Sequence, residues 1–368
     1  MLIDDETRSE LERFGFDAEL LARFAARANE TAKNEISGTI TKPTAADVSV
    51  LPAPGSAEHA ELVARGEQAI RAGEVGVIVL AGGMATRFGG VVKAAVPVAF
   101  GRSFLALKHA DVRNVSSTLG VSIPTYVMTS FATHDRIVAQ VRAEALETDT
   151  TKIVCFPQLV SLRLTPSGEL FRESDGSLSP YATGHGDLTF ALRASGVLGR
   201  FRRKGGKLLY MSNVDNLGAT LDPAIIGTHL ARGAHVTAEV VCKDRGDRGG
   251  APARVEGVPQ IVESFRFPTS FDQESIPLFN TNSFVFDAAA IDRDFDLTFF
   301  RVEKQVGGAK VVQFERLVGQ LTAFLPTHFV EVPRNGPQGR FQPVKDPEEL
   351  EARRADIEEI LRARKIHM

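Results

Sequence analysis

The sequence has little cysteine, no long apolar run and almost no net charge, and each absence excludes a class of protein. Cys155 and Cys242 are the only cysteines among 368 residues, and both stand in apolar, strand-like surroundings. Two such residues form neither a disulfide framework nor a zinc site, so we interpret both as core thiols in a reducing compartment. No apolar run approaches the ~18 residues that a membrane span requires. The first residues are acidic, and we expect a cytoplasmic protein without a membrane partner.

The charge balance argues against a nucleic-acid partner. The chain has 43 Lys and Arg against 46 Asp and Glu, a formal net charge of −3. Proteins that bind nucleic acid through bulk charge are strongly basic. The basic run from Arg200 to Lys204 follows a predicted helix, where cations are favourable in themselves. A local phosphate site remains compatible with this balance.

The most informative stretch runs from Val75 to Lys93. It begins with a short apolar run rich in β-branched residues, which predicts a strand buried on both faces. The pair Gly82–Gly83, then Arg87, then a second glycine pair follow before Lys93. Glycines after a buried strand let bare N–H groups approach a ligand, and nearby cations favour a phosphate. The spacing matches neither the dinucleotide fingerprint nor the P-loop, and the alternative is a tight turn.

Strand-like and helix-like segments alternate from Val75 onward, which predicts an α/β domain around a mostly parallel sheet. Ligands of such sheets bind beyond the carboxyl ends of the strands, where the loop after Leu80 would lie. We expect a hairpin about Gly257. The other predicted strands cover residues 124–129, 152–156, 207–211, 235–242, 283–286 and 310–312. The predicted helices cover residues 103–117, 133–146, 187–197, 223–231 and 313–321.

Three units are expected along the chain. Residues 1–73 predict an N-terminal helical cap, with helical character over 4–34 and a helix from Ser56 to Ala72. Residues 74–345 form the main α/β domain. Residues 346–368 form a terminal helix that Asp346 caps and that ends in basic residues, which complements the helix dipole.

Asp215 is the candidate metal ligand. It follows the predicted strand 207–211 within Asn213–Val214–Asp215–Asn216. A carboxylate at a strand end can hold Mg²⁺, which takes one or two carboxylates together with substrate phosphates. The alternative is an Asx turn that closes the strand. We prefer the metal, because the glycine loop ends at the same edge of the sheet.

Polar residues in three other segments are candidates for ligand contacts. His185 lies between two glycines, which predicts an exposed, mobile side chain free to donate to a phosphate or carbonyl; the alternative is a solvated histidine. Asp187 is a plausible helix N-cap. Asn280 and Asn282 carry amides that suit sugar hydroxyls, with turn chemistry as the alternative. Lys345 would ordinarily be a surface charge.

Taken together and in order, these motifs resemble those of the UTP–glucose-1-phosphate uridylyltransferases, the UDP-glucose pyrophosphorylases. The resemblance covers about residues 75–345. Its signatures include Gly-His-Gly-Asp at 184–187 and Asn-Val-Asp-Asn-Leu-Gly-Ala at 213–219, which look closer to the glucose enzymes than to the N-acetylhexosamine branch. The other matching segments are 80–83 with Thr86, 156–158, 262–263, 279–282, 313–315 and 340–345.

The resemblance implies a Rossmann-like nucleotidyltransferase domain over 74–345 that makes UDP-glucose and pyrophosphate from UTP and glucose 1-phosphate, with Mg²⁺ as cofactor. Asp215 would carry the metal and Gln158 would read uracil. The implied nucleotide-binding residues are Leu80, Ala81, Gly82, Gly83, Gln158, Gly184 and His185. The residues implied to offset phosphate charge are Lys93, Arg87 and Lys345. The implied sugar-binding residues are Asn213, Glu263, Asn280 and Asn282.

The sequence departs from the family's pattern at three points. Ala85 stands where glycine is usual, and Val92–Lys93 stands for the family's Pro-Lys, one residue early. The chain ends after one terminal helix, so we expect no C-terminal β-helix domain and leave the oligomeric state open, a monomer included. Two alternatives remain: the same reaction on another sugar 1-phosphate, or a sugar-nucleotide-binding protein without catalysis.

Overall fold

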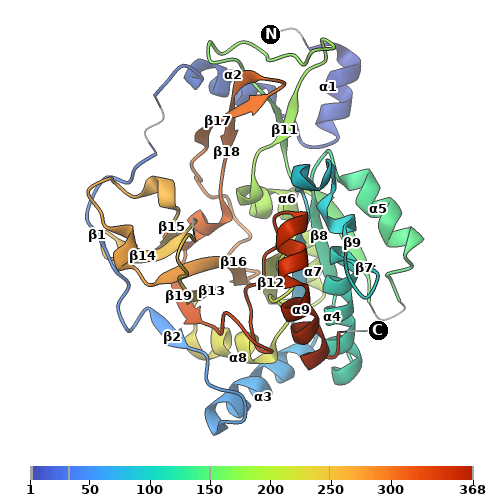
Figure 1. The fold of residues 1–368 in the computed structure, drawn as a ribbon, viewed down its shortest axis with the longest axis vertical. Helices are drawn as coiled ribbons and strands as arrows, with labels where there is room; N and C mark the ends of the chain where they lie inside the picture. The colour runs from blue at the N-terminus through green and yellow to red at the C-terminus, as the bar shows by residue number, and fades with distance from the viewer. Residues whose placement is uncertain (1–2, 32–33, 149–150, 248, 367–368) are drawn as a thin grey trace.

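The computed structural model describes residues 3–31, 34–148, 151–247 and 249–366, and an eight-stranded sheet organises them (Figure 1). Every strand of this sheet except β16 runs in the same direction, and β16 is antiparallel to both of its neighbours. The predicted α/β fold with a mostly parallel sheet is therefore confirmed. In spatial order the strands are β2 (Val48–Val50), β19 (Thr327–Glu331), β13 (Val236–Cys242), β16 (Leu278–Asp287), β12 (Leu208–Asn213), β3 (Val75–Leu80), β8 (Thr125–Thr129) and β9 (Ile153–Pro157).

Strand β3 lies inside the sheet, and both of its faces are covered. Val75, Val77 and Val79 contribute to one hydrophobic core, whereas Ile78 and Leu80 contribute to a second core on the opposite face. This explains its continuous apolar sequence. Helices α3 (Ala57–Arg71), α4 (Phe104–Leu119), α8 (Pro223–Arg232) and α9 (Pro347–Ala363) contribute to the first core; α6 (Leu188–Ala194) and α7 (Val197–Arg203) contribute to the second; α5 (His134–Ala143) packs beside β9.

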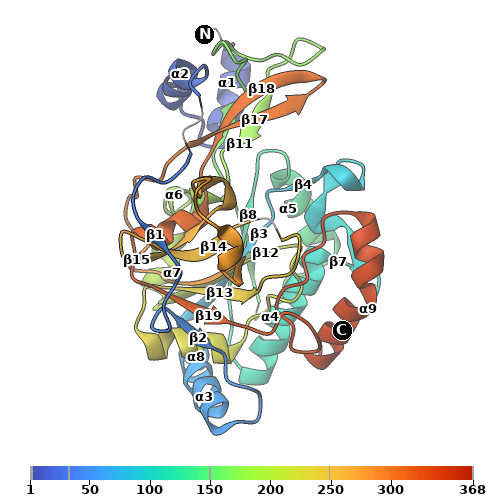
Figure 2. The ribbon, with the colours of Figure 1, turned by 60° about the vertical axis from the view of Figure 1, so that its left-hand side comes forward.

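A third core forms an arm at the top of the molecule in Figures 1 and 2, beyond the end of the sheet. Phe24 and Phe314 stack there at 4.6 Å between ring centroids. The arm consists of α1 (Asp5–Glu12), α2 (Ala18–Arg27), the pair β10 (Val160–Leu162) and β11 (Pro180–Ala182), and the pair β17 (Phe300–Val306) and β18 (Ala309–Glu315).

The remaining strands form small sheets beside the main one. The expected hairpin about Gly257 is present, and a short strand from the N-terminal region of the chain pairs with it as a third strand. These strands are β1 (Ile40–Thr41), β14 (Ala251–Val255) and β15 (Val258–Val262). Two short pairs are β4 (Met84–Ala85) with β5 (Val91–Val92) and β6 (Pro97–Ala99) with β7 (Arg102–Ser103).

The elements before residue 73 lie in several places. Helices α1 and α2 belong to the arm, α3 packs on α8 at the opposite end of the molecule, and β2 pairs into the main sheet (Figure 2). The helix from Ser56 is confirmed, with the Ser56 hydroxyl accepting the His59 N–H at 3.1 Å. The division of the chain at residues 73 and 345 stays a prediction.

Three local expectations were wrong. Residues 313–315 complete β18, and only a 3-10 helix, Val318–Ala323, follows where a helix over 313–321 was predicted. The predicted helix 187–197 is broken by Gly196, which has φ +70° between α6 and α7. Cys242 is exposed at the end of β13 rather than in a core, while Cys155 is partly buried; both thiols are free.

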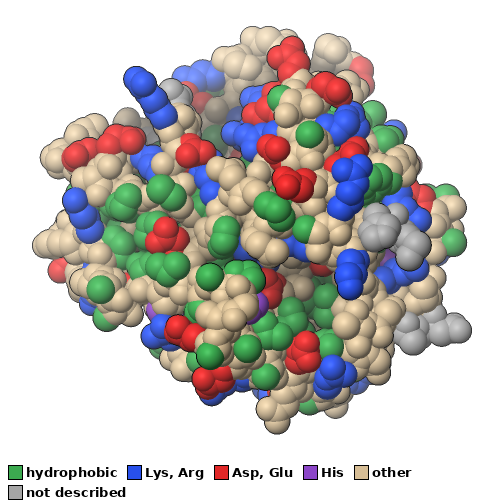
Figure 3. Space-filling view, turned by 60° about the horizontal axis from the view of Figure 1, so that its bottom comes forward, with side chains coloured by type: hydrophobic (Ala, Val, Ile, Leu, Met, Phe, Trp, Pro, Cys, Tyr) green, Lys and Arg blue, Asp and Glu red, His purple; other side chains and the backbone are tan. Residues whose placement is uncertain are grey.

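The surface shows no concentration of one charge on the face drawn in Figure 3, where basic and acidic side chains are interspersed. None of the helices in the described ranges is long and apolar enough to cross a bilayer.

The terminal helix α9 begins as expected, because the Asp346 carboxylate accepts the Glu349 N–H at 2.8 Å.

Candidate active site

Two cavities, each of about 310 Å³, lie side by side at the carboxyl ends of β3 and β12. They share a wall formed by His185, Asn213 and Asp215. The first cavity is also lined by Leu80, Gly82, Gly83, Lys93, Gln158 and Gly184. The second cavity is also lined by Glu263, Asn280, Asn282 and Lys345. Every predicted site residue other than Ala81 and Arg87 therefore faces one cavity or the other.

In the first cavity, Gly82 lets the Gln158 amide lie against the backbone of the loop. A Cβ added to Gly82 would stand 2.4 Å from Gln158 Nε2, so a larger residue at this position would displace the Gln158 amide. Gln158 is buried, and its backbone N–H donates to the Thr129 carbonyl at 2.8 Å, which fixes the residue at the end of β9. Gln158 therefore lines the cavity with an amide that carries both a donor and an acceptor.

Lys93 reaches the same cavity because the segment after β3 folds back on itself. Strands β4 and β5 pair as a short hairpin, and Gly89 and Gly90 take φ values of +83° and +76° within it. The Lys93 ammonium donates a hydrogen bond to the Asp215 carboxylate. The two side chains are 17% and 18% exposed, so water screens this ion pair only in part.

His185 is partly buried, which corrects the expectation of an exposed, mobile side chain. Its Nδ1 accepts the Val318 N–H at 3.1 Å, so the proton of the neutral ring is on Nε2. Burial lowers the pKa of His185 to about 4. Gly184 and Gly186 pack directly on the backbone of Arg316, since an added Cβ would stand 2.4 Å from the Arg316 carbonyl oxygen and 2.5 Å from its carbonyl carbon, respectively.

Asp187 holds this loop through an ion pair rather than by capping α6. Its carboxylate accepts a hydrogen bond from the Arg316 guanidinium, from the Thr183 hydroxyl at 2.6 Å and from the Leu159 N–H at 3.1 Å. Asp187 stands at the N-cap position of α6, as predicted, but its side chain makes no capping hydrogen bond to that helix. Desolvation raises the pKa of Asp187, while Arg316 opposes that shift.

A β-bulge presents the two asparagines to the second cavity. The register between β13 and β16 shifts between Glu239 and Val240, opposite residues 280–283. A bulge changes the direction in which the side chains of the bulged strand point. Asn282 has φ +58°, which asparagine tolerates better than most residues, and its Nδ2 donates to Asn213 Oδ1 at 3.0 Å. Both amides lie within β16, because the strand begins at Leu278 and not at residue 283 as predicted.

Glu263 supplies the carboxylate of the second cavity. It follows β15, and burial raises its pKa, while Arg266 lowers it. Its carboxylate lies close to the backbone of Gly250, where an added Cβ would stand 3.0 Å from Oε1. Carboxylate oxygens accept hydrogen bonds strongly, so this group suits ligand hydroxyls.

Lys345 enters the second cavity at the start of α9. Its backbone N–H donates to Glu349 Oε2 at 2.8 Å, which fixes the residue at the helix N-terminus. Its side chain is exposed, and within the described ranges it forms no ion pair. Among the described residues this lysine therefore has no acidic partner, and it lines the cavity as a cation.

Ala81 and Arg87 lie outside both cavities. Ala81 is buried, and its N–H donates to the Met128 carbonyl at 2.8 Å, so that donor is occupied. The exposed Arg87 guanidinium lies 3.7 Å from the Asp346 carboxylate and links the hairpin to the start of α9. Their implied roles at the nucleotide stay predictions.

The model of the UTP–glucose-1-phosphate uridylyltransferase family matches residues 21–362. The chain belongs to this family. A UTP–glucose-1-phosphate uridylyltransferase of Dictyostelium discoideum is 29% identical over 296 residues, which are 76% of this chain and 58% of that protein. The chain therefore spans less than two thirds of the length of this relative.

Solved structures of UDP-sugar pyrophosphorylases share the fold. A UDP-N-acetylglucosamine pyrophosphorylase of Trypanosoma brucei has a TM-score of 0.78 at 19% identity, over 96% of this chain and 79% of that one. A UDP-glucose phosphorylase of Trypanosoma brucei has a TM-score of 0.75 at 22% identity, over 94% and 77%. The Rossmann-like nucleotidyltransferase fold is therefore confirmed for this member of the uridylyltransferase family.

The donor set fits a magnesium ion that takes most of its ligands from a substrate. Within the described part of the chain, no group of three or more His, Cys, Asp and Glu side chains could hold a metal. Asp215 is a single carboxylate on the wall between the cavities. Mg²⁺ is commonly bound by one or two carboxylates, waters and substrate phosphates, so a cage of protein ligands is not required.

Sequence reasoning missed several residues of the cavities. Met128 is the next-to-last residue of the predicted strand 124–129 and lines the first cavity. Gly249 and Gly250 line the second, and their pairing before a strand is a signal for close backbone approach. Arg334 and Arg353 also line the second cavity, and nothing in their local sequence marks them.

Proposed function

We propose that the chain transfers the uridylyl group of UTP to glucose 1-phosphate and releases pyrophosphate, with Mg²⁺ as its cofactor. The observation that supports this most strongly is the shared wall of the two cavities at His185, Asn213 and Asp215. Two adjoining sites, one beside a glycine loop and one rich in hydroxyl-binding groups, suit a nucleotide and a sugar phosphate that react where they meet.

The reaction needs no protein nucleophile. A phosphate oxygen of glucose 1-phosphate attacks the α-phosphorus of UTP, and the bond from that phosphorus to the oxygen bridging to the β-phosphorus breaks. Pyrophosphate leaves with that oxygen, and UDP-glucose remains. Because the nucleophile is already an anion, the catalytic task is to hold two polyanions in line and to offset their charge.

In the first cavity, Gln158 would hold uracil through its amide, and the Gly82 backbone would lie close to the nucleotide. Lys93 would offset the charge of its phosphates. His185 would donate a hydrogen bond to the nucleotide, because its neutral ring carries the proton on Nε2 while Nδ1 accepts from Val318.

In the second cavity, Glu263, Asn280 and Asn282 would bind the sugar hydroxyls. Lys345 would offset phosphate charge from the start of α9. Asp215 would hold Mg²⁺, which supplies positive charge to the phosphates when it is bound.

The test is a pyrophosphate-release assay that crosses UTP, dTTP and ATP against a panel of sugar 1-phosphates. The proposal predicts the highest kcat/KM for UTP with glucose 1-phosphate, dependent on Mg²⁺. Preference for another sugar would replace the substrate but keep the reaction class. If calorimetry showed that the chain binds UDP-glucose, while no pyrophosphate were released in the forward assay and no UTP were formed when pyrophosphate was added, that result would contradict catalysis and favour a binding protein.

A further inference from the structure

Two segments that carry the charged groups of the proposed site run side by side. We call residues 340–345 the strap; it ends at Lys345. We call residues 213–220 the Asp215 loop. An antiparallel β-bridge joins Asn216 of the loop to Pro343 of the strap. The groups on the two segments therefore face the same cavity across a short, direct connection.

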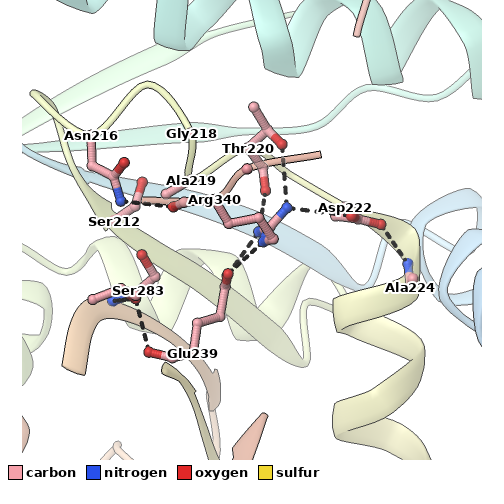
Figure 4. A network of polar contacts seen from close by, with 12 residues as sticks. Ser212, Asn216, Gly218, Ala219, Thr220, Asp222, Ala224, Glu239, Ser283 and Arg340 are labelled. Atoms are coloured by element: carbon pink, nitrogen blue, oxygen red, sulfur yellow. Dashed lines mark hydrogen bonds and ion pairs between the residues drawn. The ribbon is translucent and has the colours of Figure 1, made fainter. Parts of the chain in front are cut away.

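Asn216 connects the segments through both ends of its amide. Its Nδ2 donates to the Arg340 carbonyl at 3.1 Å (Figure 4). Its Oδ1 accepts the Gln342 N–H at 2.9 Å. The residue is 1% exposed, so these two bonds occupy a dry position next to Asp215. The asparagine side chain carries its donor and its acceptor on two separate atoms, so it can bond two points of the strap at once.

Gly218 lets the strap approach the loop. A Cβ added to Gly218 would stand 2.7 Å from the Arg340 carbonyl carbon and 2.9 Å from the Phe341 nitrogen. Both atoms belong to the strap backbone and cannot rotate away. An added methyl group would therefore push the two segments apart.

Arg340 anchors the other end of the strap in the core. Its guanidinium is 1% exposed and donates to the Glu239 carboxylate, including a bond of 2.8 Å to Oε1, and to the Thr220 carbonyl at 2.9 Å. Figure 4 shows it between Glu239, Thr220 and Asp222. A buried charge is tolerated only where it is paired, so this contact fixes where the strap begins.

We propose that Asn216 is a positioning residue, which holds Lys345 at the distance from Asp215 that the reacting phosphates require. The inference rests on the proposed function, because it assigns Asn216 an effect that passes through Lys345. Asn216 itself need not contact the substrate for this effect.

A double-mutant cycle of Asn216→Ala with Lys345→Ala tests this in the full chain. Misplacement of a charged group by about 1 Å can cost on the order of 10²-fold in rate, so Asn216→Ala should lower kcat by about 10- to 100-fold when Lys345 is present. In the Lys345→Ala background the further loss should be less than about twofold, since the two residues act as one unit. Equal losses in both backgrounds would overturn the proposal.

Gly218→Ala provides a second route to the same displacement. It should lower kcat more than it raises KM, and this loss should also disappear in the Lys345→Ala background. Gly227→Ala is the matched control, because its Cβ would meet the Leu62 backbone oxygen at 1.9 Å between α3 and α8, away from both cavities. That variant should lose stability while its folded fraction keeps the wild-type kcat; a kcat loss as large as that of Gly218→Ala would overturn the argument.

The same cycle in calorimetric Kd for UDP-glucose separates this inference from the proposed function. If the wild-type chain binds UDP-glucose without turnover, the proposed function fails, and Asn216→Ala should still weaken binding only where Lys345 is present. Weakening that is equal in both backgrounds would overturn the role of Asn216 alone. A wild-type chain that neither binds nor turns over UDP-glucose would overturn both.

Discussion

The Lys93 ammonium donates to the Asp215 carboxylate, and this ion pair joins two loops that are 122 residues apart in the chain. The loops follow β3 and β12, which are adjacent parallel strands, with Leu80 paired opposite Asn213 at their ends. The pair therefore forms where the sheet brings two loops to one edge. It keeps a cation and an anion together on the wall between the cavities.

Loss of either lysine should slow the reaction strongly. Lys93→Ala and Lys345→Ala should each lower kcat by about 10²–10³-fold, because each would remove a charge that the proposed mechanism uses to offset phosphate charge. The measurement is steady-state pyrophosphate release. Lys310→Ala is the control, since that lysine lies in the arm and pairs with Glu303 on an exposed surface; its kcat should be unchanged. Near-normal turnover in both site variants would remove them from the mechanism.

The two lysine variants should differ in stability. Lys93→Ala leaves the partly buried Asp215 without its partner, whereas Lys345 forms no ion pair among the described residues. We expect a lower melting temperature for Lys93→Ala and a wild-type value for Lys345→Ala, measured without ligand. Equal melting temperatures would show that the pair with Asp215 contributes nothing to the folded state.

Asp215→Asn should abolish Mg²⁺-dependent turnover. The amide keeps the size of the side chain but removes the negative charge that a hard cation requires. The measurement is pyrophosphate release titrated with Mg²⁺ at saturating UTP and sugar phosphate. A titration midpoint and maximum like those of the wild type would contradict the assignment of Asp215 as the metal ligand.

Neighbouring glycines should respond differently to alanine. Gly82→Ala would place a methyl group 2.4 Å from Gln158 Nε2, whereas nothing lies within 4 Å of the corresponding position at Gly83. Gly82→Ala should therefore destabilise the ligand-free protein by about 1–3 kcal/mol and raise KM for UTP, while Gly83→Ala should leave the ligand-free stability unchanged. Urea unfolding of both variants checks this, and equal stabilities would contradict the close approach of Gln158.

Stability should fall as the pH is lowered from 6.5 toward 4, in part through His185. Burial lowers its pKa from 6.5 to about 4, so the unfolded chain binds a proton in this window that the folded chain does not. The contribution of His185 is fully present above pH 6.5 and is lost as the pH falls through that range. His109 and His328, whose pKa values burial also lowers to about 4, add to the same trend.

Comparison of the wild type with His185→Gln isolates the contribution of this histidine. The variant should lose less stability between pH 6.5 and pH 4, by on the order of 1–2 kcal/mol, because it has no proton to gain. Urea midpoints at both pH values provide the measurement. Parallel losses in the two proteins would show that His185 titrates normally in the folded chain.

Local patterns predicted the sheet, and the motifs that carry the family resemblance named most of the residues that line the two cavities. The apolar run of β3 and the motifs after β3, β12 and β15 identify residues that the topology then brings to one edge. The helix predicted over residues 313–321 was wrong because of a neighbouring strand. Residues 313–315 pair with β17 across a hairpin, and that partner strand has a polar, exposed middle that shows little strand pattern.

Features set by distant contacts could not be predicted. The burial of His185 depends on Val318, and the role of Asp187 depends on Arg316, more than 120 residues further along the chain. Asn216 contacts a strap that begins 124 residues later. No periodicity or short motif carries such information, because it exists only after the elements have packed.

A crystal structure with UDP-glucose bound would test the central claim most directly, namely that the two cavities form one site. We predict uracil beside Gln158, the diphosphate next to Asp215 and His185, and glucose between Glu263 and the Asn280–Asn282 bulge. A ligand bound elsewhere, or one that occupied a single cavity with its sugar turned away from Glu263, would contradict the account.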